Sequence, residues 1–104
     1  MFKKIRSLLY FVFKLPFYKA SLGSIGVGSK LINPTLSGGK RIFIGSKVYV
    51  NDKGWLACAP LTGDVNAKLI IGDGTYIGRF CHIYSTSKIE IGKKVLMADK
   101  VYIS

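Results

Sequence analysis

A chain of 104 residues leaves room for one domain and little more. Hydrophobic residues make up 49% of it and charged residues 20%, which excludes an intrinsically disordered protein. Its 16 Lys and Arg against 5 Asp and Glu give a formal charge of +11. That charge favours an anionic partner, such as a membrane surface, nucleic acid or a phosphate-bearing small molecule.

Residues 1–22 differ in kind from the rest and predict a basic amphipathic helical segment. Five basic residues lie in its first 20 positions with no acid among them: Lys3, Lys4, Arg6, Lys14 and Lys19. The apolar stretch 8–13 is too short to cross a membrane, because a span needs about 20 apolar residues. We expect a helix to about Leu15 that ends near Pro16. This segment could cap the domain that follows, lie on a membrane surface through residues 1–20, or be a cleaved signal, and its residues leave these alternatives open.

Residues 23–104 carry aliphatic residues at intervals of six. Three runs of three have this spacing: Ile44, Val50 and Leu56; Ile71, Ile77 and Ile83; Ile91, Met97 and Ile103. Ile25 and Leu31 look like a worn first run. A strand alternates with period two and a helix repeats near 3.6, so neither explains this spacing. It predicts an all-β fold, a parallel β-helix of hexapeptide repeats with roughly four coils, preceded by the short N-terminal helix.

The corners of such a coil also have a sequence pattern. Glycine often follows the aliphatic residue, as at Gly45 and Gly72, and we expect it to supply the unusual backbone angles of the corner. The fourth residue after the aliphatic one is small or β-branched, as at Val48 and Thr75. The spacing between runs is longer than one coil, which predicts a loop over 59–68 and a bulge near 87–90.

The stretch LIIGDGTYIGRFCHIYSTSKIEIGKKVLMADKVYIS, residues 69–104, resembles the hexapeptide-repeat acetyltransferases. It is most similar to those that act on lipopolysaccharide, capsule or exopolysaccharide sugars, related to the maltose and galactoside acetyltransferases. The phrase KIEIGKKVLMADKVYIS is its most specific part. The resemblance implies a left-handed coil, acetyl-CoA as co-substrate, a sugar or glycolipid acceptor, and a homotrimer. It also implies a cytoplasmic enzyme, peripheral at the inner face of the membrane, with no nucleic-acid partner.

The same resemblance assigns site residues. In that family a stretch like VYIS is followed by a loop whose histidine acts as general base, so the catalytic histidine is expected just beyond Ser104. The 104 residues alone are therefore expected to be inactive. Phe80 stands where the family commonly has an Asn or Asp that binds the acceptor sugar. His82, the single histidine, and Ser85 and Thr86 are the other candidates for acceptor contacts.

Other residues have simpler interpretations. Cys58 and Cys81 match no metal or redox spacing and are expected to be small packed residues in a reduced setting. One His and two scattered Cys cannot form a metal site. Trp55 suits a subunit interface or a stacked sugar. The alternative to an enzyme is a non-catalytic β-helical binding module or pseudo-enzyme, held at a membrane or polyanion by its basic N-terminus.

Overall fold

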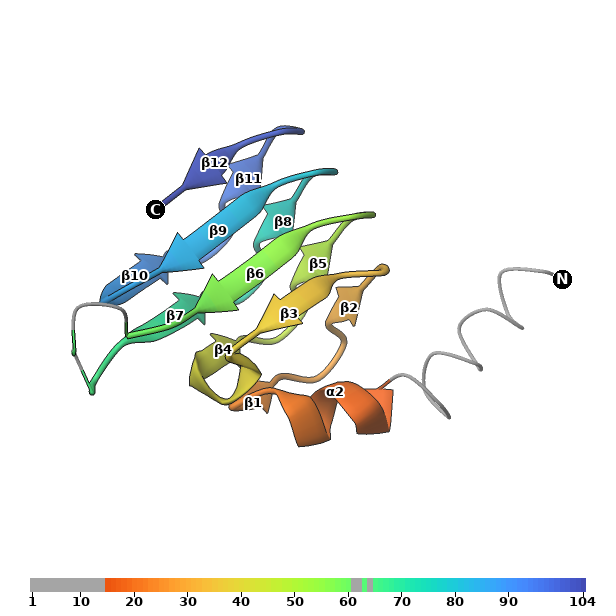
Figure 1. Cartoon of the computed structure of the whole chain (residues 1–104). Helices are drawn as coiled ribbons and strands as arrows, with labels where there is room; N and C mark the ends of the chain where they lie inside the picture. The colour runs from red at the N-terminus through yellow and green to blue at the C-terminus, as the bar shows by residue number, and fades with distance from the viewer. Residues whose placement is uncertain (1–14, 61–62, 64) are drawn as a thin grey trace, which may run out of the picture.

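The computed structural model describes residues 15–60, 63 and 65–104, which wind into a left-handed parallel β-helix of four coils (Figure 1). Every strand pair in this part of the chain is parallel. Each coil gives one strand to each of three four-stranded sheets, named A, B and C here. Parallel crossovers elsewhere are almost always right-handed, so the resemblance rather than general rules predicted this winding.

The three sheets form the sides of a triangular prism. Sheet A contains β1 (Ser24–Ile25), β4 (Ile42–Ile44), β7 (Lys68–Ile71) and β10 (Lys88–Ile91). Sheet B contains β2 (Lys30–Leu31), β5 (Tyr49–Val50), β8 (Tyr76–Ile77) and β11 (Leu96–Met97). Sheet C contains β3 (Thr35–Ser37), β6 (Trp55–Cys58), β9 (His82–Ser85) and β12 (Tyr102–Ile103).

The core is made of aliphatic ladders inside the prism, as the period of six predicts. In sheet A, Ile44 pairs with Ile71, and Ile71 pairs with Ile91 in the next coil. Most of the repeated residues are buried, including Leu31, Val50, Leu56, Ile77 and Ile83. Successive coils lie one strand spacing apart, about 4.8 Å, so like residues stack directly on one another. β-Branched side chains are suited to such a pleated, packed surface.

The corner residues with left-handed backbone angles are not the ones that the sequence suggested. In coils two to four, φ is positive at the third residue after the repeated aliphatic residue of sheet A or sheet B. In coil one, φ is positive at the equivalent corner positions. Between sheets A and B these residues are Gly28, Lys47, Gly74 and Lys94, and between sheets B and C they are Asn33, Lys53, Phe80 and Lys100. The expectation that the glycine directly after the aliphatic residue supplies the unusual corner angles is therefore wrong.

Those glycines allow a close approach between coils instead. A Cβ added at Gly72 would lie 2.6 Å from the carbonyl carbon of Gly92 in the next coil. A Cβ at Gly26 would lie 2.5 Å from the backbone nitrogen of Ser46. These distances are below van der Waals contact, so a side chain there would push neighbouring coils apart.

Several of the small or β-branched residues at the fourth position lie inside the corners. Val48, Thr75 and Cys81 are all buried. The Thr75 hydroxyl donates to the Gly92 carbonyl at 2.7 Å, and Ser29 does the same to Gly45 at 2.6 Å. Both Cys58 and Cys81 are buried and form no disulfide, which confirms that they are packed residues.

The third corner, from sheet C back to sheet A, holds the insertions. Between β3 and β4 lies the short 3-10 helix η2 (Gly39–Arg41). The Arg41 guanidinium donates to the carbonyls of Val65 at 2.8 Å and Ala67 at 3.2 Å, which ties down the end of the loop between β6 and β7. The bulge expected near residues 87–90 is absent from the described strands. Residues 88–91 pair in unbroken register with residues 68–71, and the extra length lies in a bend at residues 86–87.

Helix α2 (Leu15–Ser21) closes the first coil (Figure 1). Pro16 is its second residue, where a missing N–H removes no bond within the helix. The helix expected to run to about Leu15 and to end near Pro16 falls almost entirely on residues 1–14, outside the described residues. Tyr18 and Leu22 are buried in the core, and burial raises the pKa of the Tyr18 phenol. The Lys40 ammonium donates to the carbonyl of Ala20. The end of the N-terminal segment therefore acts as a cap, while residues 1–14, with most of the predicted basic helix, lie outside the described residues.

No helix in the described part of the chain is long and apolar enough to span a bilayer.

Candidate functional site

The outer face of sheet C carries one ring from each of three successive coils. Trp55 pairs in register with His82, and His82 pairs with Tyr102. The Trp55 and His82 ring centroids are 5.3 Å apart with an interplanar angle of 69°, and those of His82 and Tyr102 are 4.8 Å apart at 81°. Both contacts are edge-to-face, the arrangement that aromatic quadrupoles favour. We call these three residues the aromatic column.

Strand alternation explains why these rings point outward. In β9, His82 and Tyr84 are half-buried while Ile83 and Ser85 are fully buried. Each ring of the column stands directly before an inward aliphatic residue, as His82 stands before Ile83. The expectation that His82 faces outward is confirmed. Trp55 remains 40% exposed and Tyr102 68% exposed, so both are accessible to a ligand.

Phe80 extends this surface onto the corner between sheets B and C. Its backbone has a φ of 57°, and its N–H donates to the carbonyl of Asp52 at 3.1 Å. Its ring is 41% exposed, with the Lys53 ammonium 5.5 Å from the ring centroid. This is within the range of a cation–π contact. The left-handed corner therefore turns a large ring outward, two residues before His82.

Basic side chains line the same corner. Lys53, Arg79 and Lys100 are all exposed there. The acids of the corner are directed to its own polar groups: Asp99 Oδ1 accepts from the backbone N–H of Arg79 at 2.8 Å, and Asp52 Oδ1 accepts from Asn33 Nδ2 at 3.4 Å. The cations of this corner thus lie beside the aromatic column, while its carboxylates help to hold the coils together.

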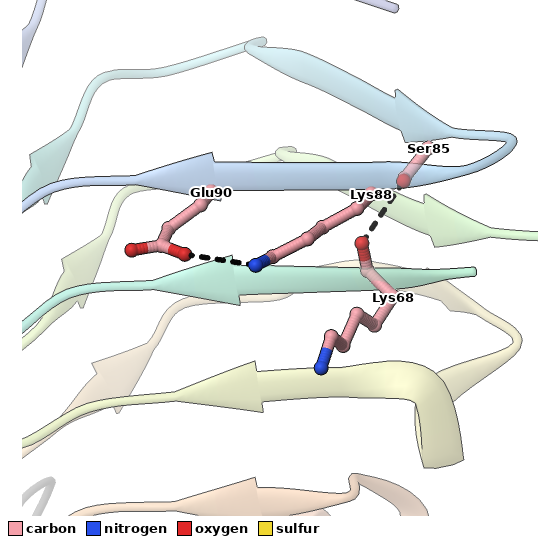
Figure 2. Close-up of polar contacts among 4 residues, drawn as sticks. All are labelled: Lys68, Ser85, Lys88 and Glu90. Carbon is pink, nitrogen blue, oxygen red and sulfur yellow. Dashed lines mark hydrogen bonds and ion pairs between the residues drawn. The ribbon is translucent and has the colours of Figure 1, made fainter. Parts of the chain in front are cut away.

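Ser85 lies at the opposite end of β9 from His82 and points into the prism. It is completely buried, and its hydroxyl lies 3.0 Å from the carbonyl oxygen of Lys68 (Figure 2). The same hydroxyl lies 2.7 Å from the carbonyl oxygen of Ser87. A single hydroxyl proton can serve one of these acceptors at a time. The contacts of Ser85 are therefore those of a residue that fastens the bend between β9 and β10.

The structure brings together two of the four predicted acceptor contacts. Phe80 and His82 share one surface, whereas Ser85 is inside and Thr86 lies in the bend after β9. Beside that bend, Lys88 and Glu90 form an exposed ion pair at 3.5 Å on the outer face of sheet A (Figure 2). A strand of four residues is about 10 Å long, so the two ends of β9 belong to separate surroundings.

Sequence reasoning missed the grouping of Trp55 and Tyr102 with His82. A signal was present, since each of the three precedes the aliphatic residue of the third hexad in its run, namely Leu56, Ile83 and Ile103. The number of residues between Trp55 and His82 differs from the number between His82 and Tyr102, because the loops inserted in the two coils differ in length. The register of the coils confirms that the three positions are equivalent.

Two other features of the described residues are weaker candidates for a binding site. Within the described residues no three His, Cys, Asp or Glu side chains lie close enough to hold a metal ion. A shallow depression on the outer face of sheet A is lined by Phe43, Ile70 and Glu90, among others, and is mainly apolar. The depression is shallow and has no grouped rings, so the surface around the aromatic column is the better candidate site among the described residues.

Comparisons of the chain with protein-family models, curated proteins and solved structures gave no match.

Proposed function

We propose that this chain is the N-terminal part of an acetyl-CoA-dependent O-acetyltransferase that acetylates a sugar hydroxyl in cell-surface polysaccharide or lipopolysaccharide synthesis. One observation carries the proposal. Hexad coils continue in register through residues 69–104, the stretch whose sequence resembles such enzymes. A fold alone is compatible with many functions, so the proposal rests on this agreement between a specific sequence and its coil geometry.

The proposed reaction needs a general base, which the resemblance places at a histidine after Ser104. A histidine beyond Ser104 would take the proton of the acceptor hydroxyl while that oxygen attacks the thioester carbonyl of acetyl-CoA. The C–S bond then breaks, the acetyl group is bound to the sugar oxygen, and coenzyme A leaves as the thiol. Base assistance of this kind contributes about 10²–10⁴-fold to the rate. The exposed surface of Phe80 and His82 would contribute to the acceptor side.

The proposal includes a homotrimer and contact with the inner face of the membrane. Exposed apolar side chains on sheets A and B, such as Phe43 and Leu96, support association of flat prism faces around a threefold axis. On α2, Phe17 is 64% exposed and Lys19 is exposed as well. An outward aromatic beside a lysine is typical of helices that lie in a membrane interface, which supports contact there.

The test begins with the coding sequence beyond the Ser104 codon. If the frame continues, the extended protein is purified and incubated with acetyl-CoA and a panel of sugars, and thiol release and sugar mass are followed. An acetylated sugar with an equal amount of thiol supports the proposal, and a panel with neither refutes it. If the frame stops there, the proposal is refuted, because the histidine that it requires after Ser104 is not encoded.

The alternative is a non-catalytic glycan-binding module. The aromatic column favours it, because exposed rings in register are suited to binding along the coil and need no chemistry. The same panel separates the two functions, since a binding module retains a sugar without releasing thiol from acetyl-CoA.

A further inference from the structure

We propose that the outer face of sheet C binds an acidic glycan chain laid along the axis of the β-helix. Sugar rings would pack against Trp55 and Tyr102, and acidic groups of the glycan would meet Lys53, Arg79 and Lys100. The inference rests on the proposed function in one respect, because the bound glycan would be the acceptor chain. Binding itself needs neither acetyl-CoA nor a general base.

The geometry of the aromatic column favours an extended chain of rings. Successive coils repeat at about 4.8 Å, which is close to the length of one sugar ring in an extended glycan. Trp55, His82 and Tyr102 therefore present one contact for each coil along a straight line. A pyranose has C–H bonds on its faces and hydroxyls around its edge. Trp, His and Tyr match it, because each combines a flat apolar body with a polar tip.

The same geometry argues against nucleic-acid bases. The ring centroids of the column are 5.3 and 4.8 Å apart and the rings already touch edge-to-face. No base can insert between them without separating the coils. A sugar chain does not need to insert, because it lies across the exposed parts of the rings.

The positive charge of the protein beside the aromatic column favours an acidic glycan over a neutral one. The chain carries a formal charge of +11, and three of its cations, Lys53, Arg79 and Lys100, are exposed along the corner beside the column. The Lys53 ammonium already lies over the Phe80 ring, 5.5 Å from its centroid. These three cations would bind the carboxylate or phosphate groups of the glycan while its sugar rings pack against the aromatic column.

A second copy of the chain is the weaker candidate for this face. Sheets A and B also expose apolar side chains, Phe43 and Leu96, so association between copies does not require the face of sheet C. The aromatic column instead carries an indole N–H, an imidazole and a phenol, which would need hydrogen-bond partners if a protein covered them.

The chain reports on this face by its own fluorescence, because Trp55 is its single tryptophan. The 104-residue protein is titrated with hexagalacturonate, with maltohexaose as the neutral glycan and with polyphosphate as a ring-free polyanion. We expect hexagalacturonate to change the Trp55 emission and to bind at least about tenfold more tightly than either of the other two, since stacking and charge act together.

Matched variants locate the site. Tyr102→Ala should weaken hexagalacturonate binding at least about tenfold, whereas Leu96→Ala, equally outward in the same coil but on sheet B, should change it less than about twofold. The double variant Lys53→Gln/Lys100→Gln should weaken binding strongly. Its control, Lys47→Gln/Lys94→Gln, removes the same charge from the same left-handed position on the other corner and should have little effect.

Several outcomes would overturn the inference. Polyphosphate binding as tight as hexagalacturonate, with equal losses in the two lysine pairs, would mean unspecific attraction of polyanions. Self-association that Tyr102→Ala abolishes and Leu96→Ala does not would assign the face to a second copy. No binding of hexagalacturonate at all would refute it directly. Thermal unfolding checks that each variant is folded. If Tyr102→Ala is unfolded, the two pairs of lysine variants, whose side chains are exposed, test glycan binding instead. Because acetyl transfer is assayed separately, binding without transfer would refute only the proposed enzyme.

Discussion

The carboxylate of Asp73 accepts a hydrogen bond from the backbone N–H of Ser46 at 2.8 Å and so joins the third coil to the second. Asp99 makes the same bond to the backbone N–H of Arg79 at 2.8 Å and so joins the fourth coil to the third, at the corner between sheets B and C. Asp73→Ala should lower the free energy of unfolding by about 1 kcal/mol, the usual net value of one such bond. Denaturant unfolding measures it. Asp73→Asn keeps the accepting oxygen and is the control, and equal losses in both variants would show that the hydrogen bond is not the cause.

The glycines between coils give a second prediction. Gly72→Ala should destabilise the chain by about 1–3 kcal/mol, because its new Cβ would overlap the backbone of the next coil. Gly92→Ala should change stability by less than about 0.5 kcal/mol, since a Cβ there meets no atom closer than 3.9 Å, from the side chain of Val95. Thermal unfolding compares the two variants. Similar losses would mean that both positions are limited by backbone angles rather than by contact.

Phe80 combines a left-handed backbone with a bulky side chain, which is a strained pairing. Phe80→Asn should raise the free energy of unfolding by about 0.5–1 kcal/mol, because asparagine tolerates that conformation and occupies the equivalent corner position at Asn33. Phe80→Ala keeps a Cβ in the same conformation and should give a smaller gain. If both variants are less stable than the parent, the ring contributes more by packing than its φ costs.

Burial of Tyr18 predicts a dependence of stability on pH. Burial raises the pKa of Tyr18 in the folded chain, while in the unfolded chain it ionises at its ordinary value of 10.0. The contribution of Tyr18 to the free energy of unfolding is therefore complete below pH 10.0, and it is lost as the pH rises from there through the folded-state pKa. Tyr18→Phe should show a shallower loss of stability in alkali than the parent. Tyr102→Phe, which changes an exposed tyrosine, is the control and should follow the parent curve.

The Ser85→Ala variant tests whether Ser85 has a structural role or contacts the acceptor. Its buried hydroxyl bonds to carbonyls beside the bend between β9 and β10, so Ser85→Ala should lower stability by about 1 kcal/mol. In a protein extended beyond Ser104 that transfers acetyl groups, the same change should leave the KM for the sugar unaltered. A raised KM with unchanged stability would contradict this and restore Ser85 as an acceptor contact. Thr86→Ala provides the comparison on the more exposed side of the bend.

The sequence alone determined the coil. The spacing of six along residues such as Ile71, Ile77 and Ile83 is set by the length of one side of the prism, so it can be counted without coordinates. Burial of those residues and the outward direction of His82 follow from strand alternation, which is local. The sequence pattern also identified the corner positions of Val48 and Thr75, because only compact side chains fit the inside of a corner.

Tertiary structure decided what depends on neighbouring coils. The need for glycine at Gly72 arises from the backbone of Gly92, 20 positions later in the printed sequence, and therefore looks like a local turn requirement until the coils are stacked. The stacking of the coils brings Trp55, His82 and Tyr102 into contact in one column. Ser85 was expected to contact the acceptor, but its side chain lies inside the prism. Side chains that meet across coils are adjacent only after winding, and that adjacency is what makes a binding face.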